Sequence, residues 1–490
     1  MRVLLIKPTF YTALAILVDE IPIGLEYIAS AIKSKVDKVV IADVAHDNID
    51  IKREIRQVKP DIIGITGQMA WHNEIVQIAR TARKSQPSAT IIAGGYYPSL
   101  FPQLLKIIPE IDLIVRGEGE NTFTEICENG TDDLSGIKGL IFRDGDQIVS
   151  SGTRPLIQNL DSLKFPARNL RRSYYTHMQF PGRYYDVITT TRGCVGRCSF
   201  CCEPDLYGKP RRRSAKNVFA EIDQIVHFHQ NSPMEITITD PNFMGRTKDD
   251  AERIYQLCDL LEERQYDLSF SILARADMVA RNPELVKRMV QNGFFFYELG
   301  IEAPDPLILK NTKKGESLNT MINSVKIVND AGGFPLGTLM LGFSGQNEEI
   351  IKQYPSYAHK LGLREAAFAL ATPLIGSGFF DEVKENIFEK NFARYNYLHP
   401  TFNFNSQISK NKVYYLLGYC YGGFYNPSAM NRNEEFYRRL LPSGYRQISL
   451  ETYLKFAFKA LREFPNHAKI TFLKGAITGY LATRKSEHKT

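Results

Sequence analysis

Short apolar runs alternate with amphipathic stretches along roughly the first quarter of the chain. Because the stretches between the apolar runs fit helices of about ten to fifteen residues, the pattern predicts a doubly wound α/β domain with a parallel sheet. The runs are rich in β-branched residues and are predicted to be buried strands: Arg2–Lys7, Lys38–Asp43, Asp61–Thr66, Thr90–Gly94 and Ile111–Arg116. In the flavodoxin-like order a ligand lies over the loops Pro8–Pro22 and Gly67–Asn73, beside the point where the strand order reverses.

A second strand–helix series follows an irregular stretch in which Asp144-Gly145 predicts a hairpin turn. Six strand–helix units predict a partial parallel barrel, with its active site at the carboxyl ends of the strands. The predicted strands are Asp186–Thr191, Glu235–Asp240, Ser269–Leu273, Phe294–Gly300, Pro335–Leu341 and Ala366–Ala371. The predicted helices are Ala215–His229, Lys248–Glu263, Pro283–Asn292, Leu318–Ala331 and Glu348–Leu361.

The last hundred or so residues show helical spacing, and the segments Val413–Tyr425, Leu450–Phe464 and Ile470–Leu481 predict a helical cap. We therefore expect an α/β domain over 1–135, a linker over 136–180, a partial barrel over 181–385 and a C-terminal helical domain over 386–490.

Composition narrows the class of protein. With 43% hydrophobic and 23% charged residues among 490, the chain is neither disordered nor fibrous, and seven cysteines are too few for a disulfide scaffold. No apolar stretch of about 18 residues and no signal peptide occur, so we expect a cytoplasmic protein without a membrane span. A net charge of +7 is small for this length and disfavours a nucleic-acid partner.

Three cysteines, Cys194, Cys198 and Cys201, lie on one short segment after the first strand of the second series. Thiolates at this spacing converge on one metal centre, and an iron–sulfur cluster bound by them would keep one iron without a cysteine ligand. Zinc remains an alternative, although structural zinc usually takes four protein ligands and no second knuckle follows. We expect the other four cysteines to be small buried residues: Cys127, Cys202, Cys258 and Cys420.

The three cysteines, the aromatic Phe200 before the third of them and the surrounding barrel pattern resemble the radical S-adenosylmethionine superfamily. The resemblance implies a 4Fe-4S cluster whose fourth iron binds S-adenosylmethionine and cleaves it to a 5′-deoxyadenosyl radical. By the same resemblance, we expect S-adenosylmethionine to be bound by Phe200, Asp240, Ser271, Arg275 and Glu302. A flavodoxin or ferredoxin would supply the electron.

Joined to such a barrel, the first domain resembles the cobalamin-binding module of the cobalamin-dependent subfamily. The resemblance rests on the segments Ala93–Pro98 and Val115–Glu120 and on the linker 161–168. It implies that Gly94, Gly95, Gly117 and Glu118 bind cobalamin.

No D-x-H-x-x-G motif follows the first strand. Cobalamin is therefore expected to bind without a protein imidazole. The lower face of the cobalt should then meet the loop after the third strand, through Gln68, Met69 and Trp71.

This pairing of cofactors implies radical chemistry at unactivated carbon under anaerobic conditions. We expect methylation of an sp3 carbon. Oxidative cyclisation without methyl transfer, as in the anaerobic magnesium-protoporphyrin monomethyl ester cyclase, is the alternative. A peptide or protein, a tetrapyrrole and an isoprenoid lipid all remain open as substrates, and a non-catalytic sensor is a further alternative.

Overall fold

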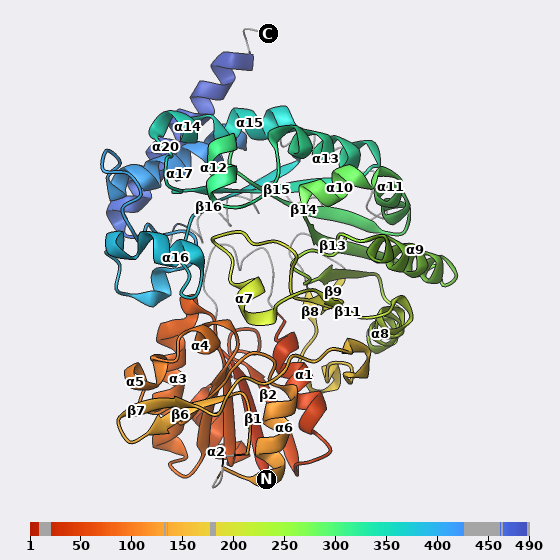
Figure 1. Ribbon diagram of the computed structural model, residues 1–490, viewed down its shortest axis with the longest axis vertical. Coiled ribbons are helices and arrows are strands. Elements are labelled where there is room, and N and C mark those ends of the chain that lie inside the picture. Colours follow the sequence, from red (N-terminus) through yellow and green to blue (C-terminus); the bar gives the residue numbers. More distant parts are fainter. Residues whose placement is uncertain are drawn as a thin grey trace.

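The structure is a computed structural model that describes residues 1–8, 21–131, 134, 136–176, 183–425, 461 and 464–487. Two seven-stranded sheets with covering helices make up most of it. Figure 1 shows the N-terminal sheet in red and orange, the second sheet in green and cyan, and the helix α7 (Glu203–Tyr207) between them. The predicted fold class, a doubly wound α/β domain joined to a partial barrel and C-terminal helices, is confirmed.

The first sheet has the strand order β2-β1-β3-β4-β5-β6-β7, and its first five strands are parallel. These strands are β1 (Arg2–Lys7), β2 (Lys38–Asp43), β3 (Ile62–Thr66), β4 (Thr90–Gly94) and β5 (Leu113–Val115). The order reverses between β1 and β3, as the flavodoxin-like reading predicted. A crevice at the carboxyl ends of these two strands is the usual ligand site of such sheets.

Both faces of the first sheet are covered, which explains the continuous apolar runs of its strands. The helices α1 (Ile23–Ile32) and α6 (Glu120–Asn129) pack together on one side, and α2 (Ile51–Val58) and α3 (His72–Ser85) pack together on the other. Leu5 of β1 belongs to the core on the α1 side, whereas Leu4 belongs to the opposite core.

The predicted hairpin is present but belongs to the first sheet. The strands β6 (Leu140–Asp144) and β7 (Gln147–Ser150) add to β5 in antiparallel fashion, so the sheet extends beyond residue 135. An antiparallel edge strand can follow a parallel sheet directly because it needs no crossover helix.

The second sheet is a half-barrel with the order β16-β15-β14-β13-β12-β9-β8, in which only β8 is antiparallel. Its strands are β8 (Tyr175–Thr176), β9 (Tyr184–Ile188), β12 (Met234–Ile238), β13 (Leu268–Ala274), β14 (Phe294–Glu302), β15 (Phe334–Leu341) and β16 (Glu365–Leu370). The main crossover helices are α8 (Ala215–Phe228), α9 (Lys248–Glu262), α11 (Pro283–Gln291), α13 (Leu318–Asp330), α14 (Glu348–Lys352) and α15 (Tyr354–Leu361). The last two replace one predicted helix, because Pro355 opens a new helix at that point.

The shorter helices lie between these elements. They are α4 (Tyr96–Leu100), α5 (Leu104–Ile107), α10 (Ala276–Arg281), α12 (Pro306–Asn311) and α16 (Gly378–Val383). The strand predicted over Asp186–Thr191 ends early, at Ile188. The chain then forms β10 (Thr191–Arg192), which pairs with β11 (Arg211–Arg212).

At the C-terminal end, α17 (Lys410–Phe424) and α20 (Asn466–Glu487) pack closely. A Cβ atom at Gly418 would lie 2.1 Å from the carbonyl oxygen of Phe472, so the helices approach through glycines. Most of the helix predicted over Leu450–Phe464 lies outside the described residues. Among the helices that the structure describes, none is long and apolar enough to cross a membrane.

A buried cluster of charged side chains joins the two halves. Arg171 of the linker pairs with Glu26 of α1 at 2.5 Å and with Asp186 of β9 at 2.7 Å, while Arg168 pairs with Asp186 and with Glu221 of α8. Burial alone would raise the pKa of Asp186, but Arg168 and Arg171 hold it well below its ordinary value. Because breaking such a network leaves a buried charge unpaired, it fixes how the two sheets sit against each other.

Candidate functional site

The cysteine segment forms a loop between β10 and α7. It begins at Gly193, which has a φ of +84° and at which a Cβ atom would lie 2.7 Å from the carbonyl oxygen of Gly208. Only glycine fits this close approach without strain. The N–H of Cys194 donates to the same Gly208 oxygen at 3.3 Å, so the loop is anchored where the first cysteine begins.

All three predicted cysteines line one cavity of about 210 Å³. A Cβ atom at Gly196 would lie 3.5 Å from the sulfur of Cys194 and 3.8 Å from that of Cys198, so glycine leaves room between the thiols. The thiols are free, and burial raises the pKa of Cys201 to about 12. Among the described residues, no group of three or more His, Cys, Asp or Glu side chains is placed so that it could hold a single metal ion. A cubane cluster instead takes one cysteine per iron, and this donor set fits it.

Three of the five residues predicted to bind S-adenosylmethionine line the same cavity: Phe200, Arg275 and Glu302. The guanidinium of Arg275 lies 3.9 Å from the sulfur of Cys198. Glu302 pairs with Lys314 at 3.0 Å. The cavity therefore places side chains of both charges beside the thiols, which suits a zwitterionic amino acid group.

The other two side chains have different partners. The buried carboxylate of Asp240 accepts from the N–H groups of Thr190 at 2.6 Å and Thr191 at 2.9 Å, and it lines neither of the cavities described here. These bonds also explain why β9 stops at Ile188. Ser271 donates to Glu235 at 2.7 Å and does not line the cysteine cavity. Asp240 thus positions the backbone that leads to the cysteine loop.

Sequence reasoning missed Lys314 and Glu298, which line the cysteine cavity. Burial raises the pKa of the Glu298 carboxyl to about 7, and Glu302 adds to the shift. The alternation of Glu298, Gly300 and Glu302 along β14 was the available signal, because such positions share one face of a strand. No comparable pattern marks Lys314, which comes from the loop after α12.

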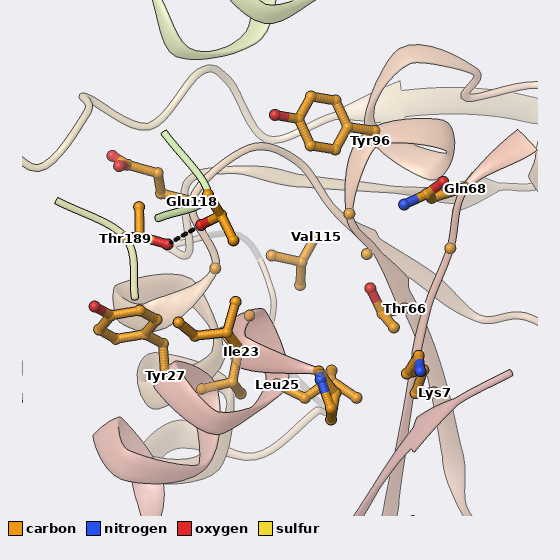
Figure 2. A pocket seen from close by; sticks show the side chains of 18 of the residues that line it. Lys7, Ile23, Leu25, Tyr27, Thr66, Gln68, Tyr96, Val115, Glu118 and Thr189 are labelled. Carbon is orange, nitrogen blue, oxygen red and sulfur yellow. Dashed lines mark hydrogen bonds between the residues drawn. The ribbon is translucent and has the colours of Figure 1, made fainter. Parts of the chain in front are cut away.

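A larger cavity of about 480 Å³ lies between the first sheet and the half-barrel. Figure 2 shows it ringed by Lys7, Thr66 and Gln68 on one side and by Tyr27 and Thr189 on the other. The lining includes six of the seven residues predicted to bind cobalamin: Gln68, Trp71, Gly94, Gly95, Gly117 and Glu118. Met69 does not line the cavity and packs in the hydrophobic core.

Glycines give this cavity its shape. Gly95 has a φ of +90°, and a Cβ atom there would lie 3.0 Å from the hydroxyl of Thr66. At Gly94 a Cβ atom would meet only the Val115 oxygen, at 3.7 Å, and would otherwise stand in the cavity. Backbone left bare in this way allows a broad, flat ligand to approach the strand ends.

One arm of the larger cavity runs between the sheet and the helices α1 and α6. Its lining is apolar, from Leu5, Ile92, Val115 and Phe123, and a Cβ atom at Gly64 would lie 2.8 Å from Leu5. No histidine is among the described residues that line this cavity. This apolar, histidine-free lining would suit a cobalamin bound without a protein imidazole.

Glu118 lines the cavity and is also held by ion pairs. Its carboxylate pairs with Arg192 and with Arg211, each at 2.9 Å, and accepts from the N–H of Ile157 at 2.7 Å. Arg192 also pairs with Glu120 at 2.5 Å. The Gly117–Glu120 loop is therefore tied to the residue two positions before Cys194.

The two cavities share a wall residue. Pro241, the residue after β12 and Asp240, lines both of them. A ligand over the first sheet and a ligand beside the cysteines would therefore be neighbours.

Comparison with known families agrees with this layout. Residues 12–127 match the B12 binding domain, and residues 188–358 match the radical SAM superfamily. The chain therefore belongs to the radical S-adenosylmethionine enzymes that carry a cobalamin-binding domain. Its cofactors are a 4Fe-4S cluster, S-adenosylmethionine and cobalamin.

Curated relatives extend over much of the chain. An uncharacterized methyltransferase of Pyrococcus horikoshii is 29% identical over 439 residues, covering 87% of this chain and 92% of the relative. The anaerobic magnesium-protoporphyrin IX monomethyl ester cyclase of Cereibacter sphaeroides is 24% identical over 365 residues, covering 73% of this chain and 58% of the cyclase.

Solved structures share the whole architecture. The radical S-adenosylmethionine methyltransferase TsrM of Kitasatospora setae matches with a TM-score of 0.66 and 16% identity over 99% of both chains. The cobalamin-dependent radical enzyme OxsB matches with a TM-score of 0.73 and 16% identity, covering 100% of this chain and 80% of that one. At these identities the likeness shows the fold.

Proposed function

We propose that this enzyme transfers a methyl group to an unactivated sp3 carbon of a peptide or a small molecule. When bound, the cluster and S-adenosylmethionine supply a radical that abstracts hydrogen, and cobalamin supplies the methyl group. The observation that carries the proposal is that Pro241 lines both cavities, because a methyl carrier must lie beside the radical source. A flavodoxin or ferredoxin in the cytoplasm would reduce the cluster.

In this proposal Cys194, Cys198 and Cys201 bind the cluster. Phe200 packs against Phe343 with ring centroids 5.6 Å apart and forms an apolar wall beside it. Arg275 and the Glu302–Lys314 pair bind the polar end of S-adenosylmethionine. Asp240 and Ser271 keep only supporting roles, because their side chains bond elsewhere.

Cobalamin in this proposal lies on the bare backbone at Gly94, Gly95 and Gly117. Gln68 and Trp71, which follow β3 and line the same cavity, would help to hold the group and to exclude water from it. Glu118 holds the rim through Arg192. Met69 supports the loop from the core.

Product analysis with methyl-deuterated S-adenosylmethionine tests the proposal. Under anaerobic, reducing conditions we expect the label in the product, together with 5′-deoxyadenosine and S-adenosylhomocysteine. An unlabelled product that still forms with 5′-deoxyadenosine would contradict methyl transfer and support oxidative cyclisation, which the similarity to the magnesium-protoporphyrin cyclase favours as the second candidate. Absence of 5′-deoxyadenosine in every condition would contradict radical catalysis itself.

A further inference from the structure

Tyr96 lies at the rim of the larger cavity and reaches across to the half-barrel. It follows Gly95 at the end of β4 and lines the cavity beside Gly94. In Figure 2 its hydroxyl points away from Gln68, toward the side of the cavity on which Glu118 and Thr189 lie. There the hydroxyl donates to the carboxylate of Glu203, and its ring meets Tyr207 edge to face at 5.4 Å.

Glu203 in turn holds both ends of the cysteine loop. Its second carboxylate oxygen accepts from the N–H of Gly193, directly before Cys194, at 3.1 Å. Its own backbone N–H donates to the sulfur of Cys201 at 3.4 Å. The side chain is only 7% exposed, and hydrogen bonds to a buried carboxylate are among the stronger ones in proteins.

The second rim loop, Gly117–Glu120, is tied to the same segment through the pairs that Glu118 and Glu120 make with Arg192. Arg192 is thus held directly by the Gly117–Glu120 loop, and Gly193 is held by Glu203, to which Tyr96 donates. A ligand bound against Gly95 and Tyr96 would therefore act on the hydrogen bond between Tyr96 and Glu203.

We propose that Tyr96 and Glu203 are positioning residues that couple cobalamin binding to the cysteine loop. The inference rests on the cobalamin and cluster sites of the proposed function and adds a linkage between them. Coupling of this kind is reciprocal: a formed cluster fixes Glu203 and strengthens cobalamin binding, and bound cobalamin fixes Tyr96 and changes the surroundings of the cluster.

The only tryptophan of the chain gives a direct measurement, because Trp71 lines the cobalamin cavity. Hydroxocobalamin is titrated into the full-length protein, without S-adenosylmethionine or substrate, and quenching of Trp71 fluorescence reports the Kd. The titration is made before and after anaerobic reconstitution of the cluster. We expect wild-type protein to bind about tenfold more tightly with the cluster, within the usual range of coupling.

The Tyr96→Phe variant removes one hydroxyl and keeps the ring. We expect this variant to bind hydroxocobalamin with the same Kd before and after reconstitution of the cluster. The matched control is Tyr97→Phe, because the hydroxyl of Tyr97 bonds to His72 at 3.0 Å and not to the cysteine loop. This control should keep the tenfold difference.

Electron paramagnetic resonance of the reduced cluster provides the second readout. Hydroxocobalamin should shift the cluster signal of wild type and of Tyr97→Phe but not that of Tyr96→Phe. Equal cobalamin affinities in both forms of wild type, or a Tyr96→Phe variant that keeps the difference, would overturn the coupling. Failure of both forms to bind cobalamin would instead contradict the cobalamin site of the proposed function.

Discussion

The two sheets, parallel except at their edges, face each other with their carboxyl ends, but they build their sites in opposite ways. The site of the first sheet is lined by glycines: Gly94, Gly95 and Gly117 leave the backbone bare beside an apolar slot. The site of the half-barrel is instead lined by ionisable side chains, which surround the three thiols: Arg275, Glu298, Glu302 and Lys314. A large flat ligand needs space and apolar contact, whereas a small charged one needs fixed partners. The difference between the sheets therefore follows from the chemistry of what each would bind.

We expect the largest effect from a substitution in the buried charged cluster that joins the two sheets. Arg168→Ala leaves Asp186 and Glu221 without one of their buried cations, and removing one partner of such a network costs about 3–5 kcal/mol. Urea denaturation followed by circular dichroism should show this loss. The control is Arg288→Ala, since the exposed pairs of Arg288 with Asp259 and Glu262 are worth at most about 1 kcal/mol. Equal stability of the two variants would contradict a structural role for the buried cluster.

A second test fills the site of the first sheet without touching that of the half-barrel. Gly94→Leu should be tolerated by the fold, because a Cβ atom meets only one ordinary contact, but its side chain would occupy the cavity. We expect cobalamin affinity to fall about 100-fold, equal to about 2.8 kcal/mol, while the cluster still assembles. Gly136→Leu, at a position with open space around it, is the control. Unchanged cobalamin binding in Gly94→Leu would place the ligand elsewhere.

We expect the smallest effect from Glu298 in the cysteine cavity, where it concerns the pH dependence of stability. Burial raises the pKa of Glu298 from its ordinary value of 4.5 to about 7, so the folded chain holds a proton that the unfolded chain releases. The stabilising effect of that proton is complete below pH 4.5 and is lost as the pH rises to about 7. Glu298→Gln should therefore gain thermal stability relative to wild type between about pH 5 and 8, by about 1 kcal/mol, since the cavity admits water. Parallel Tm curves over this range would show that Glu298 titrates normally.

The same contrast explains what the sequence could predict. Apolar runs and glycine motifs lie within single segments, so β1 to β5, the half-barrel strands and the glycine-lined cavity were accessible to pattern reasoning. Charged contacts between distant segments were not. Asp240 was expected to bind S-adenosylmethionine only by resemblance, and nothing local predicts that its carboxylate accepts from the N–H groups of Thr190 and Thr191. Lys314 carries no local signal, because only folding brings it to Glu302.

The linker shows a further limit. Arg168 and Arg171 lie in a segment of irregular sequence, and no neighbouring residue predicts their burial. In the structure they are buried beside Glu26, Asp186 and Glu221. Burial of a charge is decided by partners that lie far away in the chain. For this reason sequence patterns located the cavities better than they identified the residues that hold them together.

The most direct test of two separate but adjoining cofactor sites is a metal and cofactor analysis of the full-length protein after anaerobic reconstitution. Iron, sulfide and cobalamin are measured in wild type and in the triple variant Cys194→Ala, Cys198→Ala, Cys201→Ala. We expect one cluster and one cobalamin per wild-type chain, and cobalamin without a cluster in the variant. A variant that keeps its iron and sulfide, or a wild-type protein that binds no cobalamin, would contradict the account.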